Sequence, residues 1–353
     1  MQQPGADVPS DPADSRPSRS ARGPFGVVRT VASVAVGLAL LGVLIYHADV
    51  DQIHEHMGEL GFAGPLVLLP WTLIACLDAL GWRCTLPAAA AARVPFGSLV
   101  LVRMAGEAIN SVTPTAAVGG EPVKAHLLRR WGVAASDSLA SIVIAKTALT
   151  VSQSLFIVLG VAALCVRWER GGLGIGLVAL LLLVLAAFTM ALVRLQRRGP
   201  VTTVWRWARR LAPRSRLVAR FEPSAQAIDA RLAQFYRLEG QAFWNASGWH
   251  FAGWVLGVGE VFWIMYLIGA PVGWLDALVI EALSQPIRAA AIVIPGGLGT
   301  QEWGGVALCR LLGMSEDEAA TLWLLKRGRE LVFDGVGLGY LVRHAGLRAR
   351  FEE

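Results

Sequence analysis

The chain carries little charge and lacks the short motifs that mark metal enzymes and hydrolases. Charged residues make up 16% of its 353 residues and hydrophobic residues 55%, with a mean hydropathy of +0.53. Its four cysteines show no metal-ligand spacing, and its six histidines form no HExxH motif. A GxSxG motif and an aspartate-rich metal–diphosphate motif are also missing. We therefore expect an integral membrane protein without metal, cofactor or enzymatic activity; a membrane-embedded lipid-modifying enzyme is one alternative.

Six apolar segments are interpreted as membrane-spanning helices. About 18 or more mostly apolar residues are needed to cross about 30 Å of hydrocarbon. The segments are 31–45, 62–82, 139–166, 173–193, 242–268 and 319–342. The first follows an arginine-containing tail, and no small-residue cleavage site follows Tyr46, so we interpret it as a retained anchor helix rather than a signal peptide. These segments predict an all-α polytopic membrane protein with six full spans.

Two further apolar segments are interrupted by glycine and proline. The interruptions are TPTAAVGGEPVK at 113–124 and IPGGLGTQE at 294–302. Backbone without helical hydrogen bonds is tolerated at membrane depth only where it is buried in protein or faces a water-filled cavity. We therefore predict two re-entrant, broken helical hairpins, 96–128 and 274–312, and a transport site beside their breaks.

The distribution of basic residues predicts the topology, because arginine and lysine gather on the cytoplasmic side. The strongest basic block is the connection 194–240, and further arginines precede the first span and follow the last. Both termini are then cytoplasmic, with a disordered tail at 1–24, a membrane domain at 25–345 and a short tail at 346–353. Units of about 62–166 and 242–342 form an inverted repeat, an arrangement common in secondary transporters. If 96–113 were instead a full short span, the number of membrane crossings would change and the inverted arrangement would fail.

Polar residues follow helical spacing on four of these segments and form one stripe on each. The stripes are Arg103, Glu107 and Asn110; Lys146, Thr150 and Gln153; Glu281, Gln285 and Arg288; and Arg327, Glu330 and Asp334. They are either structural ion pairs or the lining of a polar cavity. A charge at the centre of a spanning helix costs about 2.5 to 3.5 kcal/mol, so four such stripes favour the cavity.

The glycines of the two breaks permit tight turns with positive φ. They are Gly119, Gly120, Gly296, Gly297 and Gly299. A helix that begins after such a turn presents backbone N–H groups and a partial positive charge, which favours an anionic head group such as phosphate. Glu121 and Glu302 lie at the same helix starts. Their carboxylates could cap these helices, couple transport to protons, or contact a cationic or hydroxyl-bearing ligand.

The run EAINSVTPTAAVGGEPVKAHLLRRWG at 107–132, followed by IPGGLGTQEWGGVALCRLLG at 294–313, resembles the paired signatures of a known family. This is the flippase-like family related to the transmembrane region of lysylphosphatidylglycerol synthase, and the resemblance covers about 27–345. It implies a bacterial inner-membrane protein that handles amphiphilic lipids: aminoacylated phosphatidylglycerol, polyprenyl-phosphate carriers or, through a hopanoid-associated branch, hopanoids. It highlights Asn110, Pro114, Gly119, Gly120, Glu121, Pro295, Gly296, Gly297, Gly299 and Glu302.

The sequence departs from the family pattern in two ways. The synthases carry a soluble aminoacyl-transfer domain, whereas this chain ends at Glu353 directly after the last span, so we expect no aminoacyl transfer. Lys146 stands where the family pattern implies arginine, which weakens the case for bidentate phosphate binding there.

We predict a lipid translocase, or flippase-like transporter, that binds or moves an anionic or isoprenoid-type lipid. Without a nucleotide-binding motif, transport would be passive or coupled to an ion. A non-transporting scaffold for lipid or envelope biosynthesis enzymes is the second alternative. The aromatic and basic connection 194–240 is expected on anionic inner-leaflet lipids, and positive-inside topology explains the net charge of +6 without nucleic acid. The predicted site comprises Arg103, Glu107, Asn110, Pro114, Gly119, Gly120, Glu121, Lys124, Lys146, Glu281, Arg288, Pro295, Gly296, Gly297, Gly299, Glu302, Arg327 and Glu330.

Overall fold

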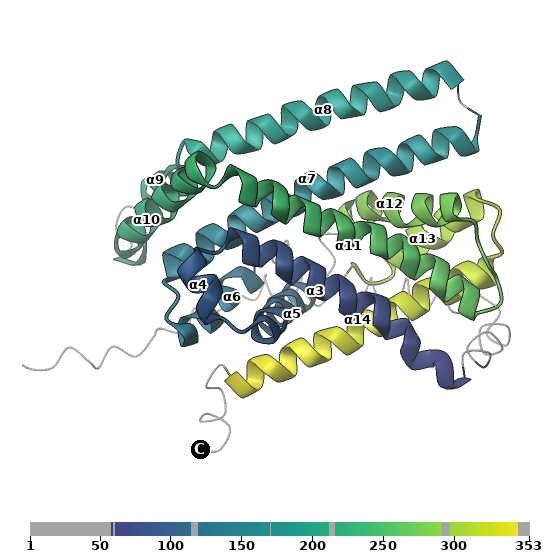
Figure 1. Ribbon diagram of the computed structural model, residues 1–353, viewed down its shortest axis with the longest axis horizontal. Coiled ribbons are helices and arrows are strands. Elements are labelled where there is room, and N and C mark those ends of the chain that lie inside the picture. Colours follow the sequence, from purple (N-terminus) through teal and green to yellow (C-terminus); the bar gives the residue numbers. More distant parts are fainter. Residues whose placement is uncertain are drawn as a thin grey trace, which may run out of the picture.

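A computed structural model describes residues 58, 61–113, 119–169, 171–211, 216–290 and 297–344, and every regular element in these ranges is a helix (Figure 1). The predicted tails, the predicted first span at 31–45, Pro114, Pro295 and Gly296 lie outside them. The helices are η1 Gly61–Val67, α3 Leu68–Thr85, α4 Ala88–Arg93, α5 Phe96–Val112, α6 Gly120–Leu128, η2 Arg129–Trp131, α7 Ala135–Arg167, α8 Gly171–Arg197, α9 Pro200–Leu211, α10 Arg216–Leu238, α11 Gly240–Leu267, α12 Trp274–Ala290, α13 Thr300–Leu311 and α14 Glu316–His344.

Four of the described helices are long and apolar enough to cross a membrane: α3 together with the end of η1, α7, α8 and α11. The predicted span at 62–82 begins as a 3₁₀ turn that contains Pro65 and becomes α-helical only at Leu68. Helix α14 has the length of a span but carries charged residues throughout, so composition alone does not place it among the spanning helices. The total number of spans therefore stays a prediction.

The helices of the two predicted units pair in equivalent ways. Helix α3 packs along α11, α5 packs against α14, and α12 packs against α7. Exchanging α3 with α11, α5 with α12, α6 with α13 and α7 with α14 reproduces this pattern. The exchanged helices α3 and α11 run in opposite directions, as do α7 and α14 (Figure 1). The units are thus inverted relative to each other in the bundle, as their charge pattern predicts.

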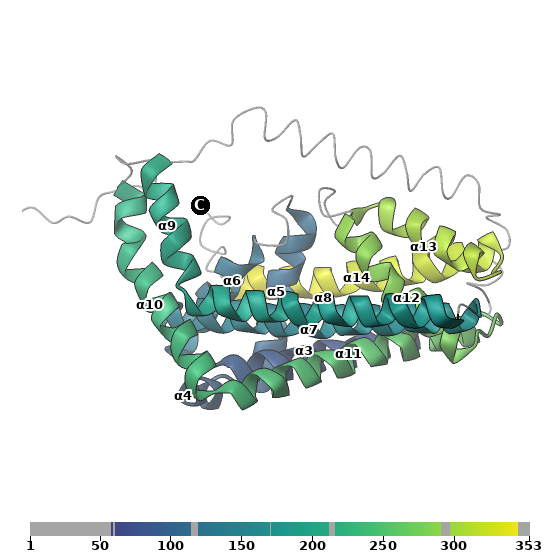
Figure 2. The same ribbon diagram turned by 90° about the horizontal axis from the view of Figure 1, so that it is seen from above.

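The two broken hairpins lie at opposite ends of the bundle. Helices α5 and α6 lie at the end where α3 finishes and α7 begins, and α12 and α13 lie at the other end (Figures 1 and 2). Helix α5 ends before Thr113, whose backbone is extended, as expected for a residue that precedes proline. The re-entrant path of each hairpin through the membrane stays a prediction.

The glycines of the breaks divide into two kinds. Gly297 and Gly299 have φ of 61° and 72°, so the prediction of positive φ is confirmed there. The same prediction is wrong for Gly119, whose φ of −64° is helical, and Gly120 is likewise not among the glycines with positive φ. Gly120 serves a different purpose, because a Cβ atom at this position would collide with the carbonyl of Gly106 on α5. It allows the two arms of the first hairpin to touch.

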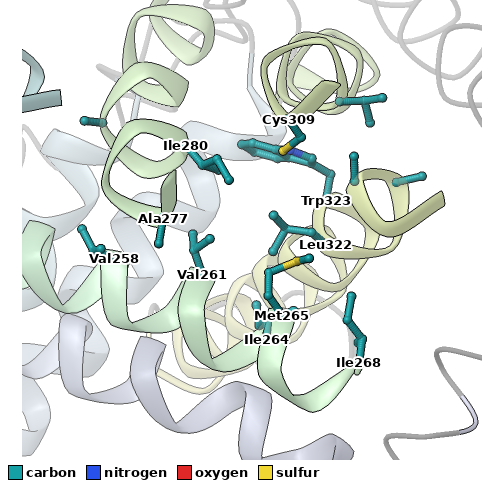
Figure 3. Close-up of a cluster of buried hydrophobic side chains, with 14 of the residues drawn as sticks. Val258, Val261, Ile264, Met265, Ile268, Ala277, Ile280, Cys309, Leu322 and Trp323 are labelled. Carbon is teal, nitrogen blue, oxygen red and sulfur yellow. The ribbon is translucent and has the colours of Figure 1, made fainter. Parts of the chain in front are cut away.

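Two of the apolar clusters lie mostly within one unit each. In the second unit, Val261, Ile264 and Met265 of α11 meet Ile280 of α12 and Trp323 of α14 (Figure 3). In the first unit, a separate cluster joins α3, α5, α6 and α7. A further cluster of Ala163, Val279 and Leu308 joins α7 to α12 and α13 across the two units.

Candidate functional site

The polar stripes on α5, α12 and α14 face a cavity of about 330 Å³ that is lined by both units. Its walls come from α3, α5, α7, α11, α12, α13 and α14. The predicted site residues on these walls are Arg103, Glu107, Asn110, Glu281, Arg288, Gly297, Arg327 and Glu330. Of the two interpretations of the stripes, both hold: the side chains form ion pairs, and many of these pairs line a cavity.

In the first unit, the charged residues form a connected cluster across α5, α6 and α7. The Nζ of Lys124 lies 2.6 Å from Glu107 and 3.3 Å from Glu121. Lys146 of α7 lies 2.5 Å from the other oxygen of Glu121. The side-chain amide of Asn110 donates to Glu107 at 3.3 Å. Both arms of the hairpin are therefore tied to each other and to the long helix α7.

In the second unit, Arg327 of α14 occupies the corresponding central place. Its Nε donates to Glu302 of α13 at 2.5 Å, and its Nη1 donates to Glu330 at 2.9 Å. The other oxygen of Glu330 accepts a hydrogen bond of 2.6 Å from Arg288 of α12. The second hairpin is thus held to α14 by a chain of alternating charges.

One ion pair occurs at equivalent positions in the two clusters. Lys146 lies eleven residues after the start of α7 at Ala135, and Arg327 lies eleven after the start of α14 at Glu316. Each pairs with the glutamate at the start of the returning arm, Glu121 or Glu302, at 2.5 Å. The same contact therefore fixes both hairpins.

The start of α6 forms a hydrogen bond with the other arm of its hairpin. The backbone N–H of Gly120, at the start of α6, donates to the side-chain carbonyl of Asn110 at 2.8 Å. The acceptor of this hydrogen bond at the start of α6 thus comes from the facing arm. Glu121 and Glu302 form ion pairs with the cations beside them.

Three charged side chains keep substantial exposure although they lie between helices. The exposed fraction is 42% for the side chain of Glu107, 39% for Lys146 and 40% for Arg288. Charges at membrane depth are stable when they face water or a polar ligand. Of the three, Glu107 and Arg288 line the main cavity, so a ligand in that cavity can reach them.

Five charged or titratable residues of the site were missed from the sequence. Asp78 lies 2.7 Å from both Arg103 and His250. Lys326 lies 2.5 Å from Glu281, and Arg329 lies 2.7 Å from Glu260. Asp78 and Glu260 are lone carboxylates within apolar spans, and this signal alone could have identified them.

The remaining predicted residues lie behind or beside the main cavity. Lys124 and Lys146 line a second, smaller cavity of about 40 Å³. Glu121 and Glu302 are buried beneath the lining, and Gly299 precedes α13. Among the described residues, no three His, Cys, Asp or Glu side chains come together as a metal site.

The fold and the cavity define an all-α, polytopic membrane protein with a charged chamber between two inverted units. The family model described as "Lysylphosphatidylglycerol synthase TM region" matches residues 30–336, and the chain belongs to this family. It is similar to a "UPF0104 membrane protein" from Methanothermobacter thermautotrophicus (strain Delta H), with 23% identity over 310 residues, covering 83% of this chain and 89% of the relative. No solved structure matches the chain.

Proposed function

We propose that the protein binds the head group of an amphiphilic lipid in the main cavity and moves that lipid between leaflets without changing it chemically. The observation that carries this proposal is one cavity lined by charged side chains from both inverted units, next to both helix breaks. Sites of this kind, between inverted repeats and beside discontinuous helices, serve alternating access in transporters. The volume of about 330 Å³ lies at the lower end of the range of about 300 to 1,000 Å³ typical of small-molecule sites.

Arg288 is the residue best placed to take an anionic head group. Its side chain is partly exposed, and among the described residues it forms an ion pair with Glu330. Guanidinium groups bind phosphate through paired N–H donors. A lipid phosphate could therefore compete with Glu330 for Arg288 while Glu330 keeps its contact with Arg327. Polyprenyl phosphates and aminoacylated phosphatidylglycerol carry such a phosphate, whereas an uncharged hopanoid does not.

The proposed location is the bacterial inner membrane with both termini in the cytoplasm. The ends of α3, α8 and α14 that carry Arg83, Arg197 and Arg343 lie at one end of the bundle (Figure 1). The acidic start of α14 lies at the opposite end. The positive-inside rule assigns the basic end to the cytoplasm.

We also propose that α9 lies on the anionic surface of the inner leaflet. The pair α9 and α10 runs across the end of the bundle, roughly perpendicular to α7 and α8 (Figure 2). Val204, Trp207 and Leu211 are exposed and share one face of α9, and Arg206 and Arg210 lie away from it. An apolar stripe with flanking arginines is typical of an interfacial helix.

Spin labels test the position of α9. In a cysteine-free chain in phosphatidylglycerol nanodiscs, a nitroxide at Leu211→Cys should collide with oxygen and be shielded from an aqueous nickel chelate. The matched label at Arg206→Cys should show the opposite pattern. Equal access of the chelate to both positions would refute the membrane contact.

Lipids retained by the gently purified protein test the proposed ligand. Mass spectrometry should find one lipid class enriched over bulk membrane, with its mass unchanged, and Arg288→Gln should lose the enrichment. The matched control is Arg310→Gln, which removes an exposed ion pair with Glu316 that does not line the cavity. A bulk-like profile in the wild type would favour the scaffold alternative, and a chemically altered lipid would favour an enzyme.

A further inference from the structure

The buried side-chain atoms that make no hydrogen bond are of different kinds on and off the wall of the main cavity. On the described residues that line this cavity, they are all nitrogens: Nε2 of His250, Nε1 of Trp254, and Nε and Nη1 of Arg329. The corresponding oxygens belong to described residues that do not line it: Glu121, Ser138, Glu260 and Glu302. Nε2 of His250 faces Gly81 of α3, where a Cβ would lie 2.7 Å away, so it is set aside. The wall therefore carries N–H donors whose hydrogen bonds a ligand with acceptor oxygens would complete.

Arg329 is a deeply buried cation on this wall, with an exposed fraction of 3%. Its Nε lies 2.7 Å from Glu260 of α11, and its guanidinium carbon lies 3.7 Å from the centre of the Trp71 ring of α3. A guanidinium that stacks on an aromatic ring keeps its N–H groups free in its own plane. Its Nη1 makes no hydrogen bond. Arg329 is thus fixed in position with donor capacity to spare.

Trp254 supplies a second donor of the same kind. Its indole stacks on Phe156, with ring centroids 6.0 Å apart and an angle of 18° between the planes. The indole nitrogen can only donate, and here it is buried without an acceptor. Trp254 and Glu260, the partner of Arg329, lie on the same helix α11. Helices α11 and α14 therefore present both donors to one cavity.

Building on the proposed binding of a lipid phosphate, we propose that Arg329 and Trp254 form an inner subsite that, together with Arg288, selects a terminal phosphate over a phosphodiester. A terminal phosphate has three non-bridging oxygens and about two negative charges. A phosphodiester has one such oxygen and one charge fewer. Two guanidiniums and one indole N–H match the terminal group in both number and charge. Arg288, which is partly exposed, meets the phosphate first, and the inner pair takes the remaining oxygens.

The carboxylates nearest to this subsite remain paired when a phosphate binds. Glu281 and Glu330 lie within electrostatic range of both arginines of the site. Glu281 lies 2.5 Å from Lys326, which belongs to neither donor set. Glu330 keeps Arg327 at 2.9 Å when Arg288 turns to the phosphate. Binding therefore leaves neither carboxylate without a cation.

Calorimetric titration of the purified protein in detergent tests this selection. The probes are farnesyl phosphate, its methyl ester and inorganic phosphate, at about pH 8, where the monoester is a dianion. The wild type should bind farnesyl phosphate at least about tenfold more tightly than the methyl ester, as expected for one hydrogen bond to a charged group. Inorganic phosphate should bind more weakly than farnesyl phosphate, because it lacks the apolar tail. Equal binding of the two esters would overturn the proposal, and equal binding of inorganic phosphate would assign the subsite to free phosphate instead of a lipid.

Two variants separate the donors from the packing around them. Trp254→Phe keeps an aromatic ring against Phe156 and removes only the N–H, so it should weaken farnesyl phosphate by about tenfold and narrow its lead over the methyl ester. The matched control is Trp323→Phe, which removes another buried indole N–H without a hydrogen bond, in the apolar core and not on the cavity wall. Wild-type affinity in Trp254→Phe would contradict the subsite, and so would the same loss in Trp323→Phe.

Arg329→Lys keeps a positive charge beside Glu260 and removes the fork of N–H donors. It should also lose the preference for the terminal phosphate, with its helix content checked by circular dichroism. An unchanged preference in this variant would exclude Arg329 from the subsite.

The titration stands apart from the transport assay. If the terminal phosphate is preferred through Trp254 but no lipid crosses the membrane, the proposed transport fails and the subsite survives. If both esters bind equally and Arg288→Gln abolishes the binding of both, the subsite fails and the proposed lipid site survives.

Discussion

Glu302 and Arg327 form a buried ion pair, and replacing Arg327 should destabilise the protein more than replacing Glu302. Glu302 is 1% exposed and Arg327 is 9% exposed. Arg327→Gln removes the cation from a buried carboxylate, and breaking such a pair costs about 3 to 5 kcal/mol. Glu302→Gln leaves Arg327 paired with Glu330 at 2.9 Å, so we expect a smaller loss of about 1 to 3 kcal/mol.

The equivalent pair in the first unit provides the comparison. Lys146 has a side chain that is 39% exposed, and Glu121 keeps Lys124 at 3.3 Å when Lys146 is changed. Lys146→Gln should therefore cost at most about 1 kcal/mol, as for a partly solvated pair. The two units would thus share the geometry of the contact, but the contact would contribute less to stability in the first unit than in the second.

Unfolding in mixed micelles with rising dodecyl sulfate, followed by circular dichroism, measures these differences. The double variant Glu302→Gln/Arg327→Gln should be more stable than Arg327→Gln alone by at least about 1 kcal/mol, because it leaves no buried charge unpaired. Equal losses for both single variants, with a double variant equal to their sum, would show that the two residues do not form this pair.

Three further predictions concern other parts of the fold. Gly337→Leu should lower the unfolding midpoint strongly, because a Cβ there would lie 2.5 Å from the carbonyl of Met104, whereas Gly339→Ala, which meets nothing within 4 Å, should leave the midpoint unchanged. Asp229→Ala should cost about 0.5 to 2 kcal/mol and speed proteolysis near α9, because Asp229 accepts the first two backbone N–H groups of that helix, and unchanged proteolysis would contradict this role. Burial raises the pKa of Tyr236 on α10, so the contribution of its neutral hydroxyl to stability is present below about pH 10 and is lost as the pH rises further. Tyr236→Phe should remove this loss of stability at alkaline pH. The same loss in Tyr236→Phe and the wild type would refute the prediction.

The long helices were predictable because length and hydropathy determine them almost locally. The segment 139–166 became α7 at Ala135–Arg167, and 242–268 became α11 at Gly240–Leu267. The polar ends of these helices extend beyond their apolar stretches, which hydropathy alone does not detect. Helix α9 was not predicted, because its arginines lower the hydropathy of a segment whose apolar residues Val204, Trp207 and Leu211 lie on one face.

The stripes of the site were predictable for the same local reason. Residues spaced by three, four or seven positions share a helix face, which brought Arg103 and Glu107 to the cavity together, and likewise Arg327 and Glu330. The partners across helices were not predictable from spacing. Asp78 and His250 are 172 positions apart, and only the packing of α3 along α11 brings them together.

The glycines show where local rules fail. Gly297 and Gly299 follow the expected positive φ, but Gly120 is required by the approach of α5, a contact that depends on how the hairpin closes. The same holds for the capping of α6 by Asn110, whose amide comes from the facing arm. These contacts depend on how the two arms of the hairpin pack together, so the residues around the break do not predict them on their own.

Lipid movement in proteoliposomes tests the central claim most directly. Vesicles with a fluorescent phosphate-bearing lipid, bleached from outside with dithionite, report the fraction that reaches the outer leaflet. The account predicts that the wild type and Arg310→Gln move the lipid, and that Arg288→Gln, which alters the exposed guanidinium of the cavity, slows it by about tenfold or more, equivalent to about 1.4 kcal/mol in the barrier. Movement at the rate of protein-free vesicles in the wild type, or an unchanged rate in Arg288→Gln, would contradict it.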